Sequence, residues 1–300
     1  MKKVVVTGCF GYIGSSVYHA LSKKGFIVAG IGRGGDDSDK MRINGDVSFL
    51  SLDRVCELIG GPPDVIFHFA GGSSVGRAEI DPAYNFESTV HSLSCLLEWV
   101  RLKCSDASII VSSSAAVYGK SSSSTLTIAS ECCPTSIYGH HKMISEDIAD
   151  IYSSRYELNV CSVRLFSVYG EGLRKQILWD TCQKLLKNEA EIEIFGTGQE
   201  KRDWIHISDV VSAFLTLATE VCLPNRMNLG TGNSHTVSQL IGFIIDAWSS
   251  KAAVTFNGVS RKGDPKELVL APGAGLNNTL ELSSGVKLYV DWFKSLHEVV

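Results

Sequence analysis

Long runs of one kind of residue are missing from this sequence. No stretch of lysine and arginine forms a basic arm, and no window reaches the ~18 uninterrupted apolar residues that a membrane-spanning helix needs. The formal net charge of -4 gives no electrostatic reason to bind nucleic acid or an anionic membrane. The apolar run near the amino end is too short for a signal peptide, and glycines follow it at once. We therefore expect a cytoplasmic protein with neither a nucleic acid nor a membrane as partner.

The cysteine and histidine spacings of a metal site are also lacking. The nine cysteines are odd in number and contain no C-x-x-C pair, and the adjacent Cys132 and Cys133 suit neither a disulfide nor a tetrahedral site. His140 and His141 are likewise adjacent, so they point to different faces of any helix that contains them. We expect no metal, and we interpret most of the cysteines as small apolar core residues that stay reduced in the cytosol.

Strand-like and helix-like segments alternate through the first half of the chain. The strand-like runs are almost continuously apolar, which is typical of a parallel sheet covered by helices on both faces. The predicted strands are 3–7, 26–32, 64–70, 107–113 and 159–166, and the predicted helices are 11–24, 84–102 and 136–155. The predicted fold class is therefore α/β, with a doubly wound parallel sheet.

The alternation breaks at about residue 170, where a smaller domain is expected to begin. The segments predicted there are a helix at 177–187, strands at 191–194 and 204–207, and a helix from Asp209 with Ser208 as its N-cap. The pattern is weak after residue 249. We predict two domains, 1–170 and 171–300, with some interleaving, and the second is a smaller α/β substrate domain. The serine run at 121–124 is predicted to be a loop.

The stretch VTGCFGYIG follows the first predicted strand and opens the first predicted helix. Glycines at this place let the backbone turn tightly and approach a pyrophosphate, and the helix start supplies free N–H groups for it. Glycines also make plain turns, but the strand–turn–helix context favours a dinucleotide site. The residues assigned to the cofactor here are Gly8, Gly11, Tyr12, Ile13 and Gly14.

The second predicted strand ends in VAGIGRGG, at a place where a carboxylate would hydrogen-bond the adenosine ribose and select NAD. Gly32 stands there and Arg33 follows, and a guanidinium suits the 2′-phosphate of NADP through a bidentate contact. The alternative is a solvated loop arginine, while Asp36, Asp37 and Asp39 come too late for the usual ribose contact. The pattern favours NADP over NAD.

Two further stretches carry side chains suited to proton transfer. VSSSAAVYG places Ser112, Ser113 and Ser114 at the carboxyl edge of a predicted parallel strand, where ligands gather in such sheets. SIYGHHKMISED places Tyr138 four residues before Lys142, so both lie on one face of the predicted helix. Taken alone, the serines fit a turn, and the pair fits a packed tyrosine beside a solvated lysine.

Together these stretches resemble the extended short-chain dehydrogenases/reductases that act on nucleotide sugars. The resemblance spans about residues 4–264 through TGCFGYIGS, DVIFHFAG, SSSAAVYG, YGHHK, VRLFSVYGEG, IFGTGQEKRDWIHISDV, NLGTGNSHTVSQL and RKGDP. It implies a Rossmann fold, with Tyr138 and Lys142 as the catalytic pair. It also implies Ser114 as the hydroxyl that hydrogen-bonds the reacting oxygen, with Ser113 close by.

The resemblance further implies how a cofactor and a substrate are held. Lys142 would hold the nicotinamide ribose, and its ammonium and the nicotinamide cation would lower the pKa of the Tyr138 phenol from about 10. The expected substrate is a nucleotide-diphosphate sugar, with Arg202 and Arg261 on its diphosphate. The other residues expected at the cofactor are Asp46, Phe69, Ala70, Gly71, Ser112 and Phe166, and those at the substrate are Ser73 and Ser167.

Departures from the family pattern narrow the reaction. Ala115 and Ala116 stand where dehydratases of the family carry an acid–base carboxylate, and no cysteine follows the serines as it does in 3,5-epimerases. Thr89 and Ser167 replace two family asparagines, and the change at Ser167 points to a different sugar or pose. The remaining reactions are NADPH-dependent reduction of a keto nucleotide sugar, by preference a 4-keto-6-deoxy sugar, and 4-epimerisation with tightly held NAD. Epimerases of the family usually carry a ribose-binding acid at the position of Gly32. Its absence here favours reduction.

A third alternative is a sensor that keeps the fold, binds NADP and catalyses nothing. Such proteins usually lose the tyrosine or the lysine, and both are present here. The resemblance also implies a homodimer that pairs two helices from each subunit, here 84–102 and 136–155. An apolar stripe on those helices fits core packing equally well.

Overall fold

The computed structural model describes residues 1–35, 39–120, 125–187, 190–259 and 265–298. The chain divides into two compact units, which are described separately below. The first unit comprises Met1–Tyr118, Cys132–Leu165 and Val211–Met227, and the second comprises Gly119–Glu131, Phe166–Val210 and Asn228–Val300. The boundary that the sequence places at 170 lies near one of several points at which the chain passes from one unit to the other.

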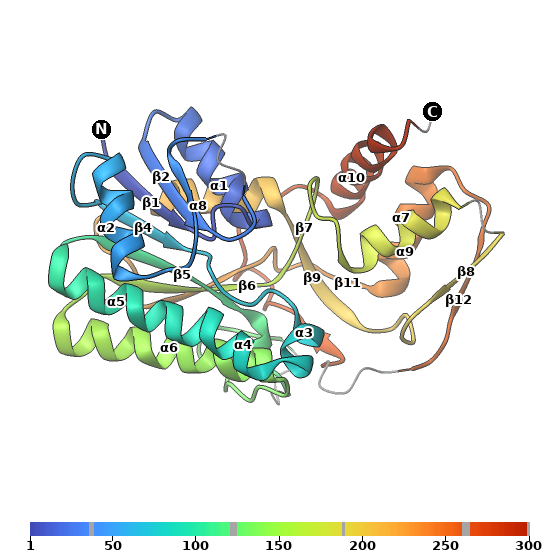
Figure 1. Ribbon diagram of the computed structural model, residues 1–300. Helices are drawn as coiled ribbons and strands as arrows, with labels where there is room; N and C mark the ends of the chain where they lie inside the picture. The colour runs from blue at the N-terminus through green and yellow to red at the C-terminus, as the bar shows by residue number, and fades with distance from the viewer. Residues whose placement is uncertain (36–38, 121–124, 188–189, 260–264, 299–300) are drawn as a thin grey trace. The chain divides into compact units, whose positions relative to one another are not determined.

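The first unit is built on a seven-stranded sheet in the order β10-β6-β5-β4-β1-β2-β3 (Figure 1). Its strands are β1 Lys3–Thr7, β2 Ile27–Gly32, β3 Arg42–Asn44, β4 Val65–His68, β5 Ser108–Ser114, β6 Val160–Leu165 and β10 Arg226–Leu229. The pairings from β3 through β6 are parallel. The strand order runs outward in both directions from β1 and β4, so the predicted doubly wound α/β fold is confirmed.

Helices cover both faces of this sheet, and two neighbouring residues of β4 show how. Ile66 belongs to the large apolar core shared with α2, α5 and α6, whereas Phe67 packs edge-on against Phe214 of α8. Successive strand residues point to opposite faces, so these helices lie on opposite sides. Figure 1 shows α5 and α6 as neighbouring long helices. The helical segments are α1 Tyr12–Lys23, α2 Phe49–Leu58, α3 Val75–Ile80, α4 Pro82–Phe86, a π-helical turn Glu87–His91, α5 Ser92–Lys103, a short 3₁₀ turn Ala115–Val117, α6 Ile137–Tyr156 and α8 Ile207–Leu217.

The helix α6 is fixed at both ends by local chemistry. The Ser136 side chain caps its start by accepting a 3.1 Å hydrogen bond from the Gly139 N–H. Glu157 ends it in the left-handed conformation, with φ of 57°. The helix buries Lys142 and Glu146 among small residues, an unusual inward face for an amphipathic helix. Two charged side chains are therefore carried into the interior of the first unit.

The second unit contains smaller sheets and the remaining helices. Strand β9 pairs with β7, β11 and β13, and β8 pairs with β12. The elements are β7 Ser167–Tyr169, α7 Gln176–Leu186, β8 Glu191–Ile194, β9 Lys201–His206, β11 Ser234–Thr236, α9 Val237–Trp248, β12 Ala253–Phe256, β13 Glu267–Leu268 and α10 Leu282–Leu296. The segment after residue 249, whose sequence pattern is weak, thus contains two short strands and a long helix.

Two expectations for the region near residue 206 were wrong in detail. The helix α8 begins at Ile207, so Ser208 lies inside its first turn and is not the N-cap. The Ser208 hydroxyl instead lies 2.7 Å from His206 Nδ1, within hydrogen-bond distance. Strand β9 runs over Lys201–His206, longer than the predicted 204–207. The predicted loop at 121–124 lies outside the described residues.

All nine cysteines lie in the described part of the chain and are unpaired. Only Cys9, Cys161 and Cys182 are buried, so the interpretation of most cysteines as core residues was wrong. Among the described residues, no helix is both long enough and apolar enough to span a bilayer.

Candidate active site

Tyr138 and Lys142 lie on α6 beside the carboxyl end of β5. Lys142 Nζ donates a 2.7 Å hydrogen bond to the Ser112 carbonyl oxygen and lies 6.0 Å from the centre of the Tyr138 ring. The Ser114 side chain hydrogen-bonds the Tyr138 side chain and accepts a 3.1 Å bond from the Ala116 N–H. The structure therefore brings together the serine, tyrosine and lysine that the sequence assigns to catalysis.

Burial dominates the protonation of this pair. It raises the pKa of the Tyr138 phenol, although the hydrogen bond from Ser114 acts in the opposite direction. Burial also lowers the pKa of the Lys142 ammonium to about 8, and the Glu146 carboxylate partly offsets this. The expected lowering of the Tyr138 pKa by Lys142 is therefore not a property of the protein chain alone. At neutral pH the chain presents a neutral phenol, the form that can donate a proton.

Ser113, the other serine assigned to catalysis, points into the protein. Its Oγ donates a 2.5 Å hydrogen bond to Glu146 Oε1, and both side chains are buried. Its hydroxyl is thus engaged with α6. The sequence analysis missed Glu146, yet one signal was available, since it follows Lys142 by one helical turn on the same face.

A π-helical turn lies next to Lys142. Thr89, at the centre of the turn Glu87–His91, is buried and accepts a 2.9 Å hydrogen bond from the Gly72 N–H. A Cβ added at Gly71 would lie 3.5 Å from both Lys142 Nζ and Thr89 Oγ1, so these polar atoms flank the same backbone. Single π-helical turns are frequent at functional sites. Gly71 and Thr89 therefore belong to the surroundings of Lys142.

His68, at the end of β4, is a buried histidine that the sequence analysis did not single out. Its Nδ1 lies 2.9 Å from Thr7 Oγ1, and its Nε2 finds no hydrogen-bond partner within the described part of the chain. Burial, followed by the charge of Lys142, lowers the pKa of His68 to about 3. The imidazole is therefore neutral in the folded protein under ordinary conditions.

The neutral state of His68 makes a prediction for acid stability. The folded pKa of about 3 lies below the ordinary 6.5, so the unfolded state binds more protons between these values and stability falls as pH falls below 6.5. The wild type should lose about 2–3 kcal/mol more than His68→Asn between pH 6.5 and about pH 4.5, at about 1.4 kcal/mol per unit. Urea unfolding across this pH range measures the difference. His140→Asn, at an exposed histidine of α6, should follow the wild type, and equal slopes for wild type and His68→Asn would contradict the account.

The predicted dinucleotide loop has the geometry that a pyrophosphate needs. A Cβ on Gly8 would lie 2.6 Å from backbone atoms of Phe69 and Ala70, so the ends of β1 and β4 meet without room for side chains. Gly11 begins α1 with no side-chain cap, and the first turn of α1 has no acidic residue. Free N–H groups at a helix start favour an anion. Within the described residues, this loop therefore fits a dinucleotide.

Arg33 and Asp46, both assigned to the cofactor, are bonded to each other. Arg33 Nε lies 3.1 Å from the Asp46 carboxylate, and both side chains are largely exposed. The guanidinium also lies 4.9 Å from the centre of the Tyr84 ring. Arg33 as a ligand of a 2′-phosphate and Arg33 as a solvated loop residue both stay predictions. An incoming 2′-phosphate would have to compete with a carboxylate already in place.

The residues assigned to the substrate are divided between the units. Ser73 is exposed in the first unit, and Ser167 and Arg202 belong to the second, as does Phe166, which was assigned to the cofactor. Arg202 Nη1 donates hydrogen bonds of 2.8 and 3.1 Å to backbone carbonyl oxygens, and its side chain is tied to the end of the small sheet. Arg261 lies outside the described residues. These four substrate assignments and that of Phe166 stay predictions.

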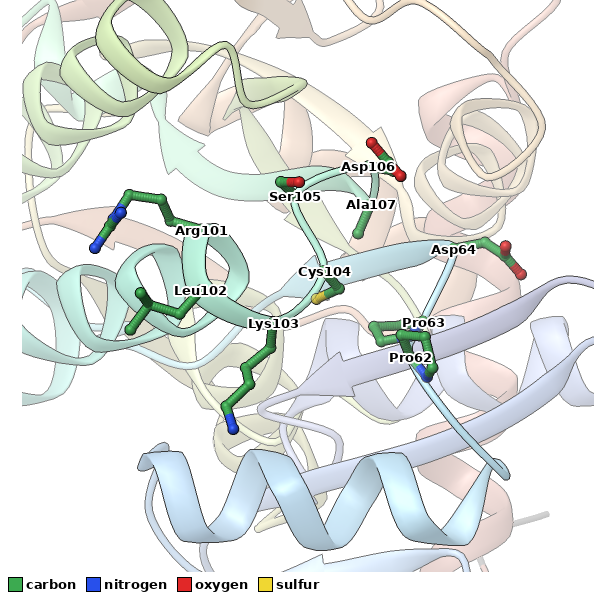
Figure 2. Close-up of a pocket in the computed structure, with 10 residues that line it drawn as sticks. All are labelled: Pro62, Pro63, Asp64, Arg101, Leu102, Lys103, Cys104, Ser105, Asp106 and Ala107. Atoms are coloured by element: carbon green, nitrogen blue, oxygen red, sulfur yellow. The ribbon is translucent and has the colours of Figure 1, made fainter.

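A cavity of about 410 Å³ in the first unit lies away from these residues. Figure 2 shows it between the segment before β4 and the end of α5. Its lining is formed by residues 62–64 and 101–107. Ligands of parallel sheets bind at the carboxyl ends of the strands, whereas this cavity lies at the amino ends of β4 and β5. It therefore takes no part in the site. Among the described residues, no cluster of potential ligands could hold a metal ion.

Comparison with known proteins agrees with this arrangement. A sequence profile described as "NAD dependent epimerase/dehydratase family" matches residues 4–230. The chain belongs to this family. The predicted resemblance to nucleotide-sugar enzymes with a Rossmann fold is thereby confirmed.

Named relatives match this chain over most of their own length. It is 27% identical to a UDP-glucose 4-epimerase of Azospirillum brasilense, over 99% of this chain and 94% of that one. It is 29% identical to UDP-glucose 4-epimerase 4 of Oryza sativa, over 89% and 82% of the two chains. The solved structure of a UDP-glucose 4-epimerase from Thermotoga maritima with UDP-glucose superposes with a TM-score of 0.85 at 25% identity, covering 98% and 99% of the chains.

Proposed function

We propose that this protein is a nucleotide-sugar 4-epimerase that works with NAD. The observation that carries the proposal is the grouping of Ser114, Tyr138 and Lys142 at the end of β5, followed by Ala115 and Ala116. The alanines have no ionisable side chain, so they supply no base to remove a proton from carbon. The phenol can exchange a proton with a sugar oxygen. This limits the chemistry to oxidation and reduction of a carbon that bears oxygen.

Each residue of the chain has a distinct task in this reaction. A bound nicotinamide would supply the acceptor and donor of hydride. Tyr138 takes the proton of the sugar hydroxyl during oxidation and returns it during reduction, while Ser114 holds the same oxygen by a hydrogen bond. Tyr138 has to be a phenolate before the oxidation and becomes one again after the reduction, and the Lys142 ammonium together with a bound nicotinamide cation would stabilise that form. We assign Ser73, Ser167, Arg202 and Arg261 to a nucleotide-diphosphate sugar, by resemblance.

The choice of NAD and epimerisation depends on Arg33. The sequence favoured NADPH and reduction because Gly32 and Arg33 replace the ribose-binding acid. The ion pair of Arg33 with Asp46 weakens that argument, because the charge is already balanced. The UDP-glucose 4-epimerases that match almost the full chain support the same direction. Gly32 still favours a second candidate, the NADPH-dependent reduction of a 4-keto-6-deoxy nucleotide sugar.

Two assays on the purified protein distinguish these functions. An epimerase should interconvert UDP-glucose and UDP-galactose, or another pair of C4 epimers, with no net change in nicotinamide absorbance. Proton NMR of the sugar measures this, and extraction of the protein identifies any retained dinucleotide. Stoichiometric oxidation of NADPH with 4-keto-6-deoxy sugars would instead establish the reductase. Tight NADP binding without turnover of any sugar would favour the sensor and contradict the proposal.

We also propose a homodimer through the outer face of α6 and its neighbours. Ile144 and Ile151 are exposed on this helix, at 37% and 54% of their full area, and Leu102 is exposed at the end of α5. Covering this apolar face with a second copy would remove it from water. A monomer mass by light scattering at micromolar concentration would contradict the dimer.

We place the enzyme in the cytoplasm, because nine unpaired cysteines suit a reducing compartment.

A further inference from the structure

Positions 138, 142 and 146 of α6 lie one turn apart on one face of the helix. The first two are the catalytic pair, and they contact the serines on either side of Ser113 at the end of β5. The third, Glu146, takes the remaining serine through the 2.5 Å hydrogen bond from Ser113 Oγ. Three successive strand residues are thus each tied to one turn of the helix that carries Tyr138 and Lys142.

The Glu146 carboxylate contacts polar side chains of three strands. Besides Ser113 on β5, it accepts bonds of 2.9 and 2.6 Å from Arg164 Nε and Nη2 on β6. Arg226 Nε on β10 lies 3.2 Å away. Glu146 and Arg164 are 2% and 3% exposed. A carboxylate so deeply buried is retained only when charge and hydrogen bonds compensate for its lost hydration, and here both do.

We propose that Glu146 is a positioning residue for the reaction, fixing the register of α6 against β5 through Ser113 and acting as the counter-charge of Lys142. The proposal rests on the proposed function for what the catalytic pair does, but the geometry stands without it. A slide of α6 along β5 would move the Tyr138 oxygen away from Ser114. The hydrogen bond between Ser113 and Glu146 opposes that slide. Glu146 follows Tyr138 by eight residues, so the bond acts at a distance from the reacting oxygen.

The charged groups around Lys142 and Glu146 determine the expected effect of removing the Glu146 charge. Lys142 faces Glu146 and Tyr138 on its own helix and His68 on β4. Burial holds the pKa of Lys142 at about 8, and only the Glu146 charge acts to raise it. The groups that face Glu146 itself are Arg164, Arg226, Cys132 and Asp150. Loss of the Glu146 charge should therefore move the titration of Lys142 downward, and two arginines would be left without their shared partner.

Two variants separate the two tasks of Glu146. Ser113→Ala removes the tie but keeps the charge, so kcat should fall about tenfold at unchanged KM, the signature of misplaced catalytic groups. Glu146→Gln keeps an acceptor for Ser113 but removes the charge, so the pKa of Lys142 should fall by about one unit, the effect of one neighbouring opposite charge. Lysine Cε NMR on the full-length protein measures that titration, and Ser113→Ala should leave it in place.

The neighbouring Asp147 provides the control. It is 63% exposed on the same helix, and Asp147→Asn should alter neither kcat nor the Lys142 titration. An unchanged titration in Glu146→Gln, or an unchanged kcat in Ser113→Ala, would overturn the proposal. If Glu146→Gln does not fold, Ser113→Ala still tests the register. The lysine titration needs no substrate, so it reports on Glu146 even where no epimerisation is found.

Discussion

Tyr138→Phe should lower kcat about a thousandfold, within the range that general acid–base catalysis contributes. The substitution deletes only the oxygen that Ser114 hydrogen-bonds, and the ring keeps its place on α6. No other titratable group directly contacts this oxygen in the described part of the chain, and Ala115 and Ala116 supply none. Affinity for the dinucleotide should change by no more than about twofold, because the substitution impairs proton transfer and not cofactor binding. Steady-state rates of C4 epimerisation and a fluorescence titration with NADH measure the two quantities.

A second tyrosine on the same helix controls for loss of a phenol as such. Tyr156 lies at the end of α6, 49% exposed, with its ring against Arg101. Tyr156→Phe should leave kcat within about twofold of the wild type, as for surface substitutions generally. If Tyr138→Phe retains wild-type turnover, the phenol is not the proton carrier and the proposed mechanism is wrong. If both variants lose activity, a change in the structure of α6 is the cause, and not the loss of the Tyr138 oxygen.

The sequence predicted strands β1, β2, β4, β5 and β6 of the first unit, because each contains an apolar run, but it missed β3, β10, α2 and α3. The helix predicted at 84–102 is divided by the π-helical turn Glu87–His91. Strand β1 and helices α1 and α6 were predicted to within about two residues, the usual uncertainty of such boundaries. The C-terminal helix α10 was missed although its signal was present. Its buried apolar residues recur at helical spacing, at Val286, Tyr289, Val290 and Phe293. The irregular segments before this helix made its 3.6-residue periodicity hard to recognise.

The site was predicted where it depends on local spacing and not where it depends on contacts far along the chain. Tyr138 and Lys142 are four residues apart, so one helix suffices to bring them together. The bond between Ser113 and Glu146 joins residues 33 apart, and Arg33 meets Asp46 across a loop. Such pairs arise from packing of the whole unit, which no short stretch encodes. For the same reason the Lys142 pKa of about 8 follows only from its burial.

The second large effect is expected from Gly14→Ala in the first turn of α1. A Cβ there would lie 2.2 Å from the Gly8 carbonyl oxygen and 2.8 Å from its carbon, far inside any contact distance. Both atoms are backbone, and Gly8 is itself held in the left-handed region at φ 69° against Phe69 and Ala70. Neither side can yield without moving α1 away from β1. We expect the free energy of unfolding to fall by about 2–3 kcal/mol, as for overpacked interiors.

The same displacement should weaken dinucleotide binding more than tenfold, equivalent to about 1.4 kcal/mol or more. The start of α1 has to lie close to the loop after β1 for its N–H groups to reach a pyrophosphate. Gly76→Ala is the matched control, because Gly76 lies in α3 of the same unit with open space around its Cβ position. It should keep the affinity and raise stability by about 0.5–1 kcal/mol. Urea unfolding and NADH titration of both variants give the result. A Gly14→Ala protein that unfolds like the wild type but no longer binds would mean that the methyl group obstructs the ligand directly, and the argument from helix displacement would be wrong.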